Sequence, residues 1–329
     1  MSSHQLIGSI KQHQPIPLRI SDTAYEKAVA FKPRSTDCFV TTPPKTGTTL
    51  TQFIAHLLRA VSTSDIEQDS LFKNANIFED LNQFAPWAMM AWDLGYDITE
   101  IDYEQRCLVS NQTYPVRLFK SHQRLHAMNP GAKYITLIRN PKSTLVSWYN
   151  YLKGKDIPPL RKYTSPSEFA FDKRFFAKGM NFGASLWEYY NEYVACLRDP
   201  NVLIVVYEDL AKDTRRHLPV ISRFLGLEVS DKHMDEITRL ASRDEMLNNS
   251  KFDESWEAQQ LKLLNRSKGQ GPGPFKPGPT VTPGSDSSIL STEAIKFLDD
   301  QWSKIVETNT GIKNYEELAH VVREEFQKR

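Results

Sequence analysis

The stretch between residues 38 and 58 constrains the fold of this chain more than any other. It begins with an apolar run, passes through a turn rich in Thr, Pro and Gly, and continues as a helical pattern of apolar residues: Leu50, Phe53, Ile54, Leu57 and Leu58. The first N–H groups of such a helix have no partner within the helix, and the helix dipole adds partial positive charge there. A strand, a tight turn and a helix in this order predict a cradle for a phosphate or a similar anion.

The residues of the turn suit an anionic ligand. Lys45 supplies a full positive charge, and Gly47 lets the backbone approach the oxygens of the ligand. The hydroxyl groups of Thr46, Thr48 and Thr49 add hydrogen-bond donors. The lysine precedes the glycine, so the Walker A order, G-x-x-x-x-G-K-[ST], is absent, which argues against an ordinary ATPase.

Short apolar runs and the helical patterns between them indicate the fold class. The predicted strands are residues 38–42, 116–119, 134–138 and 202–206. The predicted helices are residues 48–58, 142–152, 182–197, 214–225, 292–305 and 315–326. Continuous apolar runs suit strands covered on both faces, and their alternation with helices predicts a single α/β domain with a central, mostly parallel β-sheet flanked by helices. Ligands of such sheets bind beyond the carboxyl ends of the strands, where Lys45, His122 and Arg139 follow three of the runs.

Length and composition fit one large domain. The chain has 329 residues, of which 40% are hydrophobic and 25% are charged, as in ordinary globular proteins. We expect residues 1–35 to form an N-terminal leader segment and residues 36–329 to form the domain. The Gly- and Pro-rich stretch at about 265–288 is expected to be an irregular loop within it.

Charge and cysteine content bear on the partners and the compartment of the protein. The net charge of +1 gives no reason to expect a nucleic-acid partner. Cys38, Cys107 and Cys196 are widely spaced in apolar contexts, which favours buried, reduced thiols. The sequence contains no signal-like N-terminus and no apolar run of roughly eighteen residues. We therefore expect a cytoplasmic protein with no membrane partner.

Several ordered motifs resemble those of the cytosolic-type sulfotransferases. Residues 43–50 read PPKTGTTL and are similar to that family's 5′-phosphosulfate loop, P-K-x-G-T-T. Residues 117–122 read RLFKSH and resemble its F-K-[ST]-H segment, which bears the catalytic base. Residues 134–142 read YITLIRNPK and, with Ser147, resemble its arrangement for the 3′-phosphate of the nucleotide. Two further segments follow in the family's order, namely VVYEDL at 205–210 and FLGL at 224–227.

The resemblance implies a P-loop-like sulfotransferase fold, a donor and a set of site residues. The donor would be 3′-phosphoadenosine 5′-phosphosulfate (PAPS), with PAP as the product and no metal. His122 would act as general base, and Lys45 and Lys120 would stabilise the transferring group. The residues that the resemblance assigns to donor binding are Lys45, Thr46, Gly47, Thr48, Thr49, Leu50, Arg139, Ser147, Tyr207, Ser242, Arg243, Arg266, Lys268 and Gly269.

The chain departs from the family pattern at the expected adenine and dimer segments. Leu50 stands where the family usually has Trp, and Arg243 stands where it has Phe. A guanidinium plane can stack on a purine, so either Arg243 or an aromatic residue from another segment would take the place of the missing ring. Arg243 also has a purely structural explanation, as a solvated charge at a helix end that pairs with Asp244 or Glu245. Ser285 replaces the Glu of the family's dimer segment, so we expect a monomer or a weak homodimer.

The stretch at 77–96 is unusually rich in aromatic residues and Met. The resemblance implies that it helps to wall an acceptor pocket, with Phe84, Trp87, His122 and Tyr151 as pocket residues. A buried helix with its flank explains the same composition without any functional role. The acceptor would be a small molecule: an alcohol, a phenol, a steroid or an amine.

Two other function classes stay open on the sequence. A P-loop nucleoside or nucleotide kinase would share the fold, but the Walker order and a clear Mg²⁺-binding carboxylate are missing. A non-catalytic nucleotide-binding relative would not need both Lys120 and His122, because binding alone requires no base. Arg139 also has a purely structural explanation, since it could cap its own turn or pair with a surface carboxylate. His56 and His126 lie in no motif, and we predict no role for them.

Overall fold

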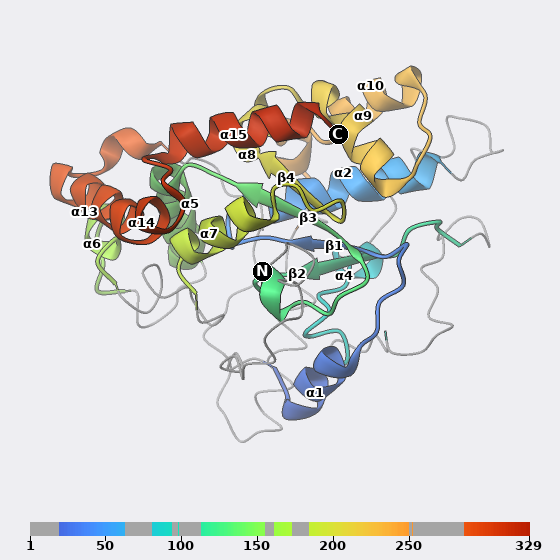
Figure 1. Cartoon of the computed structure of the whole chain (residues 1–329), viewed down its shortest axis with the longest axis horizontal. Coiled ribbons are helices and arrows are strands. Elements are labelled where there is room, and N and C mark those ends of the chain that lie inside the picture. The colour runs from blue at the N-terminus through green and yellow to red at the C-terminus, as the bar shows by residue number, and fades with distance from the viewer. Residues whose placement is uncertain are drawn as a thin grey trace.

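The computed structural model describes residues 20–62, 81–93, 98, 113–154, 161–172, 184–249, 252 and 286–329. The described residues contain one four-stranded parallel sheet with the strand order β2-β1-β3-β4 (Figure 1). The strands are β1 (Cys38–Thr41), β2 (Leu118–Ser121), β3 (Lys133–Ile138) and β4 (Val202–Val206). The predicted α/β domain with a parallel sheet is confirmed.

Helices surround this sheet. In chain order they are α1 (Asp22–Ala30), α2 (Thr48–Val61), α4 (Leu81–Phe84), η2 (Leu125–Ala127), α5 (Pro141–Gly154), α6 (Pro166–Phe169), α7 (Leu186–Cys196), α8 (Tyr207–Lys212), α9 (Thr214–Leu225), α10 (Asp231–Leu240), α11 (Arg243–Leu247), η5 (Ser287–Ile289), α13 (Thr292–Trp302), η6 (Ser303–Glu307), α14 (Thr308–Thr310) and α15 (Tyr315–Gln327). The six helices predicted from the sequence all appear among them. The predicted helix at 292–305 continues through the π-helical η6 and α14, until Gly311 ends it in the left-handed conformation.

The sheet has a hydrophobic core on each face, as expected for a strand that is apolar at every position. Along β4, Val202, Ile204 and Val206 join one core with residues of α5, α7, α13 and α15. Leu203 and Val205 point to the opposite face and join a second core with residues of α2, α9 and α10. The molecule is thus three layers thick, helices on sheet on helices, and α15 packs along the edge strand β4 (Figure 1).

Several element boundaries differ from the sequence-based expectation, and the starts of β2 and α7 differ by two residues or more. β2 begins at Leu118 rather than at residue 116, because its pairing with β1 starts at Leu118 opposite Cys38. α7 begins at Leu186 rather than at residue 182, because Ser185 caps it: the Ser185 hydroxyl accepts from the backbone N–H of Glu188, whose carboxylate accepts from the Ser185 N–H. The shift of β2 leaves Lys120 within the strand and His122 immediately after it.

Residues 86–88 pair with β2 at the edge of the sheet. Trp87 forms an isolated parallel bridge with Lys120. The Lys120 N–H donates to the carbonyl of Pro86 at 2.9 Å, and the Ala88 N–H donates to the carbonyl of Lys120 at 3.0 Å. These bonds fix residues 86–88 of the aromatic, Met-rich stretch against the strand that carries Lys120.

The described part of the expected leader is ordered around α1. Ile20 and Ala24 are buried with Trp87, Met89 and Met90 in a small hydrophobic cluster. The segment therefore packs on the same stretch that borders β2. Most of the loop predicted at 265–288 lies outside the described residues, and its last residues enter η5.

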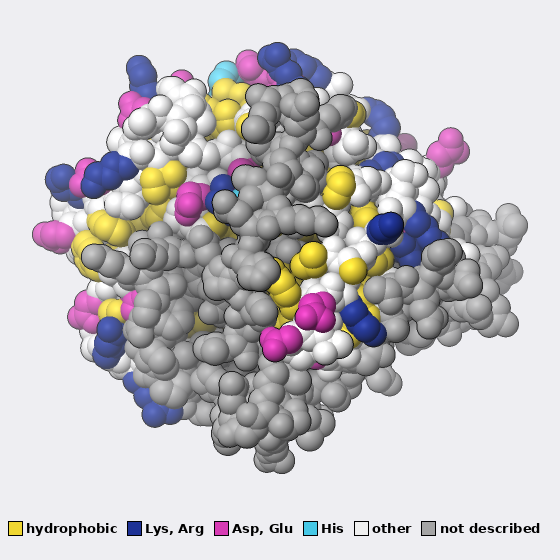
Figure 2. Space-filling model, turned by 60° about the horizontal axis from the view of Figure 1, so that its bottom comes forward, with side chains coloured by type: hydrophobic (Ala, Val, Ile, Leu, Met, Phe, Trp, Pro, Cys, Tyr) yellow, Lys and Arg dark blue, Asp and Glu magenta, His cyan; other side chains and the backbone are white. Residues whose placement is uncertain are grey.

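The surface of the described part is mixed in character. Figure 2 shows one face, on which acidic and basic side chains are interspersed with hydrophobic ones. Cys38 and Cys196 are buried thiols, as predicted, and Cys107 lies outside the described residues. None of the described helices is long and apolar enough to cross a membrane.

Candidate functional site

The carboxyl ends of neighbouring strands bring the predicted site residues to one edge of the sheet. Thr41, the last residue of β1, pairs with Ser121, the last residue of β2. The loop that carries Lys45 therefore begins next to His122. Arg139 follows the last residue of β3, and β3 pairs with β1 on the side away from β2. Parallel topology alone explains this convergence.

The loop before α2 is held by its own hydroxyl groups. The Thr46 hydroxyl donates to the Pro43 carbonyl at 2.7 Å, and the Thr42 and Thr48 hydroxyls share a 2.5 Å hydrogen bond. Thr46 is fully buried, so its hydroxyl proton serves the loop in this structure. Lys45 has a φ of 66°, which is unusual for a residue with a side chain. The loop is thus held in a strained conformation of a kind often found at binding sites.

Gly47 precedes α2 with a φ of 115°. A Cβ atom at this position would lie 2.6 Å from Cδ2 of Tyr207 and 3.0 Å from Cδ2 of Leu137. Position 47 therefore requires glycine for two reasons, namely the positive φ and the close packing of Tyr207. The sequence predicts the residue but not the second reason, which depends on a side chain from α8.

The imidazole of His122 is fixed by a backbone acceptor. Its Nδ1 lies 2.8 Å from the carbonyl oxygen of Thr42. A carbonyl oxygen only accepts, so Nδ1 carries the hydrogen, and in the neutral ring the lone pair lies on Nε2. Tyr189 adds a second constraint, because its hydroxyl donates to the His122 carbonyl at 2.5 Å. His122 is buried, with 9% of its surface exposed.

Trp87 lies against the side chains of both Lys120 and His122. The Lys120 Nζ is 4.8 Å from the centre of the Trp87 ring, within the range of a cation–π contact. The His122 ring meets the same indole edge to face, with centroids 5.3 Å apart and an interplanar angle of 85°. Trp87 is thus adjacent to two predicted catalytic residues, the place expected of a pocket residue.

The other predicted pocket residues have different surroundings. Phe84 is buried, stacks on His56 with centroids 4.3 Å apart and belongs to the core beneath α2. Tyr151, on α5, is half-buried, and its ring centre is 4.5 Å from the Nζ of Lys45. Tyr151 therefore lies beside the loop, whereas the ring of Phe84 packs into the core.

Arg139 connects the end of β3 to the loop. Its Nη1 donates to the Lys45 carbonyl at 2.6 Å, and its guanidinium carbon lies 4.3 Å from the centre of the Tyr207 ring. Its Nε is buried and has no hydrogen-bond partner in the described part of the chain. Neither of the structural roles considered from the sequence, capping its own turn or pairing with a surface carboxylate, accounts for these contacts. An orphaned guanidinium donor is suited to an anionic ligand.

The turn after Arg139 is held by the VVYEDL segment. The carboxylate of Glu208 accepts from the Asn140 N–H at 2.9 Å and from the hydroxyl of Tyr315 on α15. Ser147 is buried on α5, two turns beyond this point. The backbone that presents Arg139 is therefore fixed by elements from distant parts of the sequence.

The predicted adenine residues lie at helix starts. Ser242 caps α11, and its hydroxyl accepts from the Glu245 N–H. Arg243 is the first residue of α11 and is exposed. Leu50 is half-buried against the core beneath α2. Three further predicted donor residues, Arg266, Lys268 and Gly269, lie outside the described residues.

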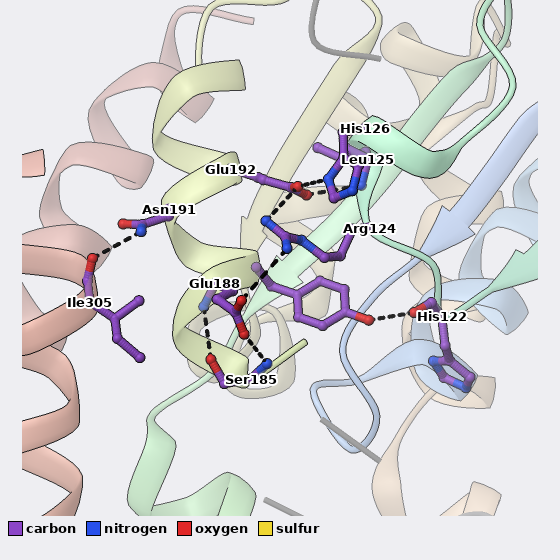
Figure 3. Close-up of polar contacts among 10 residues, drawn as sticks. His122, Arg124, Leu125, His126, Ser185, Glu188, Asn191, Glu192 and Ile305 are labelled. Carbon is purple, nitrogen blue, oxygen red and sulfur yellow. Dashed lines mark hydrogen bonds and ion pairs between the residues drawn. The ribbon is translucent and has the colours of Figure 1, made fainter. Parts of the chain in front are cut away.

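The site also contains residues that the sequence analysis missed. Glu192 on α7 is buried, and its carboxylate accepts from the Arg124 guanidinium at 2.8 Å, from the Leu125 N–H at 3.1 Å and from His126 Nδ1 (Figure 3). His126 thus has a structural partner, although no motif contains it. Thr42 was missed because it acts through its backbone carbonyl, which leaves no trace in the sequence.

The described residues contain no group of three or more His, Cys, Asp or Glu side chains that could hold a metal ion. Burial raises the pKa of Cys38 to about 12, and a nearby Asp37 adds to this effect against the opposing influence of Lys133. Burial also raises the pKa of Cys196 to about 12. Both thiols therefore stay neutral at physiological pH, which makes them poor nucleophiles.

A strand, a Thr-rich loop and a helix over the end of a parallel sheet define a P-loop-like α/β protein. Residues 35–271 match the sulfotransferase domain family. This chain belongs to the sulfotransferase family, and the resemblance inferred from the motifs is confirmed.

Individual relatives are similar at modest identity. The amine sulfotransferase of Oryctolagus cuniculus is 29% identical over 226 residues, which are 67% of this chain and 66% of that protein. Sulfotransferase 6B1 of Danio rerio is 31% identical over 149 residues, 42% of this chain and 47% of that protein. Sulfotransferase 4A1 of Homo sapiens is 28% identical over 221 residues, 65% and 68% of the two chains. The chain thus matches less than two thirds of the length of the first two relatives.

Solved structures share the fold. Mouse sulfotransferase SULT7A1 complexed with PAP superimposes with a TM-score of 0.61 at 18% identity, covering 95% of this chain and 96% of that one. Retinol dehydratase in a complex with retinol and PAP gives a TM-score of 0.60 at 18% identity, covering 87% and 88% of the two chains. The arrangement of strands and helices around the site is thus a sulfotransferase fold.

Proposed function

We propose that this protein transfers the sulfuryl group of PAPS to a hydroxyl or amine of a small-molecule acceptor, with His122 as general base. The observation that carries this proposal is the hydrogen bond between His122 Nδ1 and the Thr42 carbonyl. It assigns the hydrogen to Nδ1, so the neutral ring holds its basic lone pair on Nε2. A histidine fixed in one tautomer beside a phosphate-type loop is suited to remove the proton of a nucleophile.

The residues at the strand ends fit the proposed donor. The buried, unsatisfied Nε of Arg139 and the glycine-dependent loop at Gly47 suit a ligand with several anionic groups. Residues 45–50 would hold its 5′-phosphosulfate, and Arg139 with Ser147 would hold its 3′-phosphate. When bound, PAPS supplies the sulfuryl group, and PAP is the leaving product.

Lys45 and Lys120 would provide the positive charge that stabilises the transition state. By analogy with phosphoryl transfer, an in-line displacement needs positioning and cations more than covalent help. Lys45 would neutralise charge on the leaving phosphate oxygen, and Lys120 would stabilise the transferring group from the neighbouring strand. Trp87 lies against both Lys120 and His122, so it would form the pocket wall nearest to the reacting atoms. The proposed reaction requires no metal.

Adenine recognition is proposed to differ from the usual ring sandwich. Leu50 has no ring, and Arg243 is exposed at the start of α11, where a guanidinium plane can reach a ligand without losing buried contacts. We propose that Arg243 stacks on the adenine, while Ser242 both caps α11 and borders the base. Arg266, Lys268 and Gly269 remain proposed contacts of the 3′-phosphate.

The acceptor class follows from chemistry and from the relatives. A general base and a pocket wall of Trp87 suit an acceptor with an apolar body and one hydroxyl or amine. The relatives named amine sulfotransferase and 3-alpha-hydroxysteroid sulfotransferase motivate amines and hydroxysteroids as candidates. We further propose a cytoplasmic location and a monomer or weak homodimer.

The test is a donor-dependent screen. Purified protein is incubated with ³⁵S-labelled PAPS and separate panels of phenols, hydroxysteroids, aliphatic alcohols and amines, with and without EDTA. We expect labelled product with at least one panel, and EDTA should not change the amount of product. Transfer of phosphate from ATP that requires Mg²⁺ would instead support a kinase, and PAP binding without any transfer would support a non-catalytic relative.

A further inference from the structure

Two adjacent tyrosines on α7 contact two different parts of the proposed site. The Tyr189 hydroxyl donates to the backbone carbonyl of His122 at 2.5 Å. The Tyr190 hydroxyl donates to the backbone carbonyl of Arg139 and accepts from the Arg139 N–H at 3.0 Å. One helix therefore bonds to the backbone of the proposed base and to the backbone of the proposed phosphate-binding arginine.

Helix geometry explains how neighbouring residues reach separate strands. Consecutive side chains on an α-helix diverge by roughly 100°. β2, which ends before His122, and β3, which ends before Arg139, lie on opposite sides of β1. α7 joins the hydrophobic core on one face of the sheet, and from there Tyr189 reaches the residue after β2 and Tyr190 reaches the residue after β3.

Both hydroxyls are buried donors. Tyr189 is 2% exposed and Tyr190 is completely buried. Burial raises the pKa of Tyr189 well above its ordinary value, with a further contribution from Glu192, and burial likewise raises the pKa of Tyr190. Each hydroxyl therefore keeps its proton at physiological pH and remains able to donate.

The segment after His122 has a second attachment to the same helix. The Glu192 carboxylate holds the Arg124 side chain, the Leu125 N–H and His126 (Figure 3). Glu192 lies nearly one turn beyond Tyr189. α7 thus fixes the His122 segment at both ends, while Tyr190 separately fixes Arg139.

We propose that Tyr189 and Tyr190 are positioning residues with separate effects, Tyr189 on proton removal by His122 and Tyr190 on the grip of Arg139 on the 3′-phosphate of the donor. This inference rests on the proposed function. Neither hydroxyl contacts the reacting groups directly, because each acts through the backbone of another residue.

The experiment removes one hydroxyl at a time. The variants are Tyr189→Phe and Tyr190→Phe, and Tyr193→Phe is the matched control. Tyr193 is 1% exposed on the same helix, and no described hydrogen bond joins its hydroxyl to His122 or Arg139. All three substitutions keep the ring, so the core stays filled. For each variant, calorimetry gives the affinities for PAP and for adenosine 5′-phosphate, which lacks the 3′-phosphate, and thermal unfolding gives the stability.

The expected effects differ between the variants. A hydrogen bond of ordinary net strength corresponds to roughly five- to tenfold in an equilibrium or rate. Tyr189→Phe should lower kcat by about this factor while the PAP affinity changes less than roughly twofold. Tyr190→Phe should weaken PAP by about the same factor, leaving both the affinity for adenosine 5′-phosphate and kcat at saturating donor nearly unchanged. Tyr193→Phe should change neither kcat nor the nucleotide affinities.

An NMR measurement, which needs no turnover, tests the proposed effect of Tyr189 on His122. In ¹⁵N-labelled protein, the His122 imidazole signals are identified by their loss in His122→Ala. Tyr189→Phe should shift or broaden the Nδ1–H signal of His122, and Tyr190→Phe should leave it in place.

Equal losses of kcat and PAP affinity in all three variants, in proportion to their lost stability, would overturn the inference by showing a merely structural role. An unmoved His122 signal in Tyr189→Phe would overturn the Tyr189 half. Failure of the wild type to bind PAP is a different result, because it would contradict the proposed function itself.

Discussion

Replacing Gly47 with alanine tests how the loop before α2 is built. The new Cβ atom would lie 2.6 Å from Tyr207 Cδ2 and 3.0 Å from Leu137 Cδ2, distances that force these side chains to move. The φ of 115° adds strain, since side chains rarely adopt it. Backbone strain of this kind costs about 1–3 kcal/mol, and overpacking of a buried site costs a further 1–3 kcal/mol or so. We expect the free energy of unfolding to fall by roughly 2–6 kcal/mol.

Two other glycines separate these contributions. Gly131 has a similar φ of 107°, but the nearest atom to its Cβ position is the Pro33 carbonyl oxygen at 3.8 Å, so Gly131→Ala should show backbone strain alone. Gly154, at the end of α5, has nothing within 4 Å of its Cβ position, so Gly154→Ala should be neutral or stabilising by up to about 1 kcal/mol. Urea unfolding of the three variants gives the comparison. A Gly47→Ala variant that loses no more stability than Gly131→Ala would refute the packing argument.

Three further predictions concern the donor site and the buried thiols. Arg139→Ala should weaken PAP by about 1.5–3 kcal/mol but adenosine 5′-phosphate much less, measured by calorimetry, and equal weakening would remove Arg139 from the 3′-phosphate site. Arg243→Ala should weaken PAP several-fold, by roughly 0.5–2 kcal/mol, while Arg243→Phe should retain or improve affinity; equal binding by both and the wild type would place Arg243 outside the adenine site. Burial raises the pKa of Cys38 and of Cys196 from 9.0 to about 12, so folding favours the neutral thiols. The contribution of these thiols to the free energy of unfolding is therefore complete below pH 9 and is lost as the pH rises toward 12. Iodoacetamide at pH 8 should therefore label neither thiol in the folded protein and both in urea, as mapped by mass spectrometry, and rapid labelling of the native thiols would contradict their burial.

The sheet was predictable because its strands are apolar at every position. Residues 202–206 illustrate this, since both faces of β4 are buried and the observed strand has the predicted bounds. The start of β2 was predicted two residues early because Val116 is as apolar as the strand itself. Only the pairing with β1 excludes it from the strand, and register is not written in the sequence of a single strand.

The site was predictable where side chains act and unpredictable where the backbone does. Lys45, His122 and Arg139 could be placed at strand ends, because each follows an apolar run in the sequence. Thr42 acts through a carbonyl oxygen, which every residue has. Tyr189 and Tyr190 reach partners 67 and 51 residues away, so local periodicity predicts their helix but not their hydrogen bonds.

The proposed reaction depends on His122 removing the proton of the acceptor. Once the screen identifies an acceptor, the decisive measurement is the rate of sulfuryl transfer at saturating PAPS in the wild type and in His122→Ala, with the PAP affinity of each protein measured separately. In His122→Ala, turnover should fall by roughly 10²-fold or more while the PAP affinity changes little, because a base is removed and the donor contacts remain. Turnover retained within a few-fold of the wild type would contradict the assignment of His122 as the base.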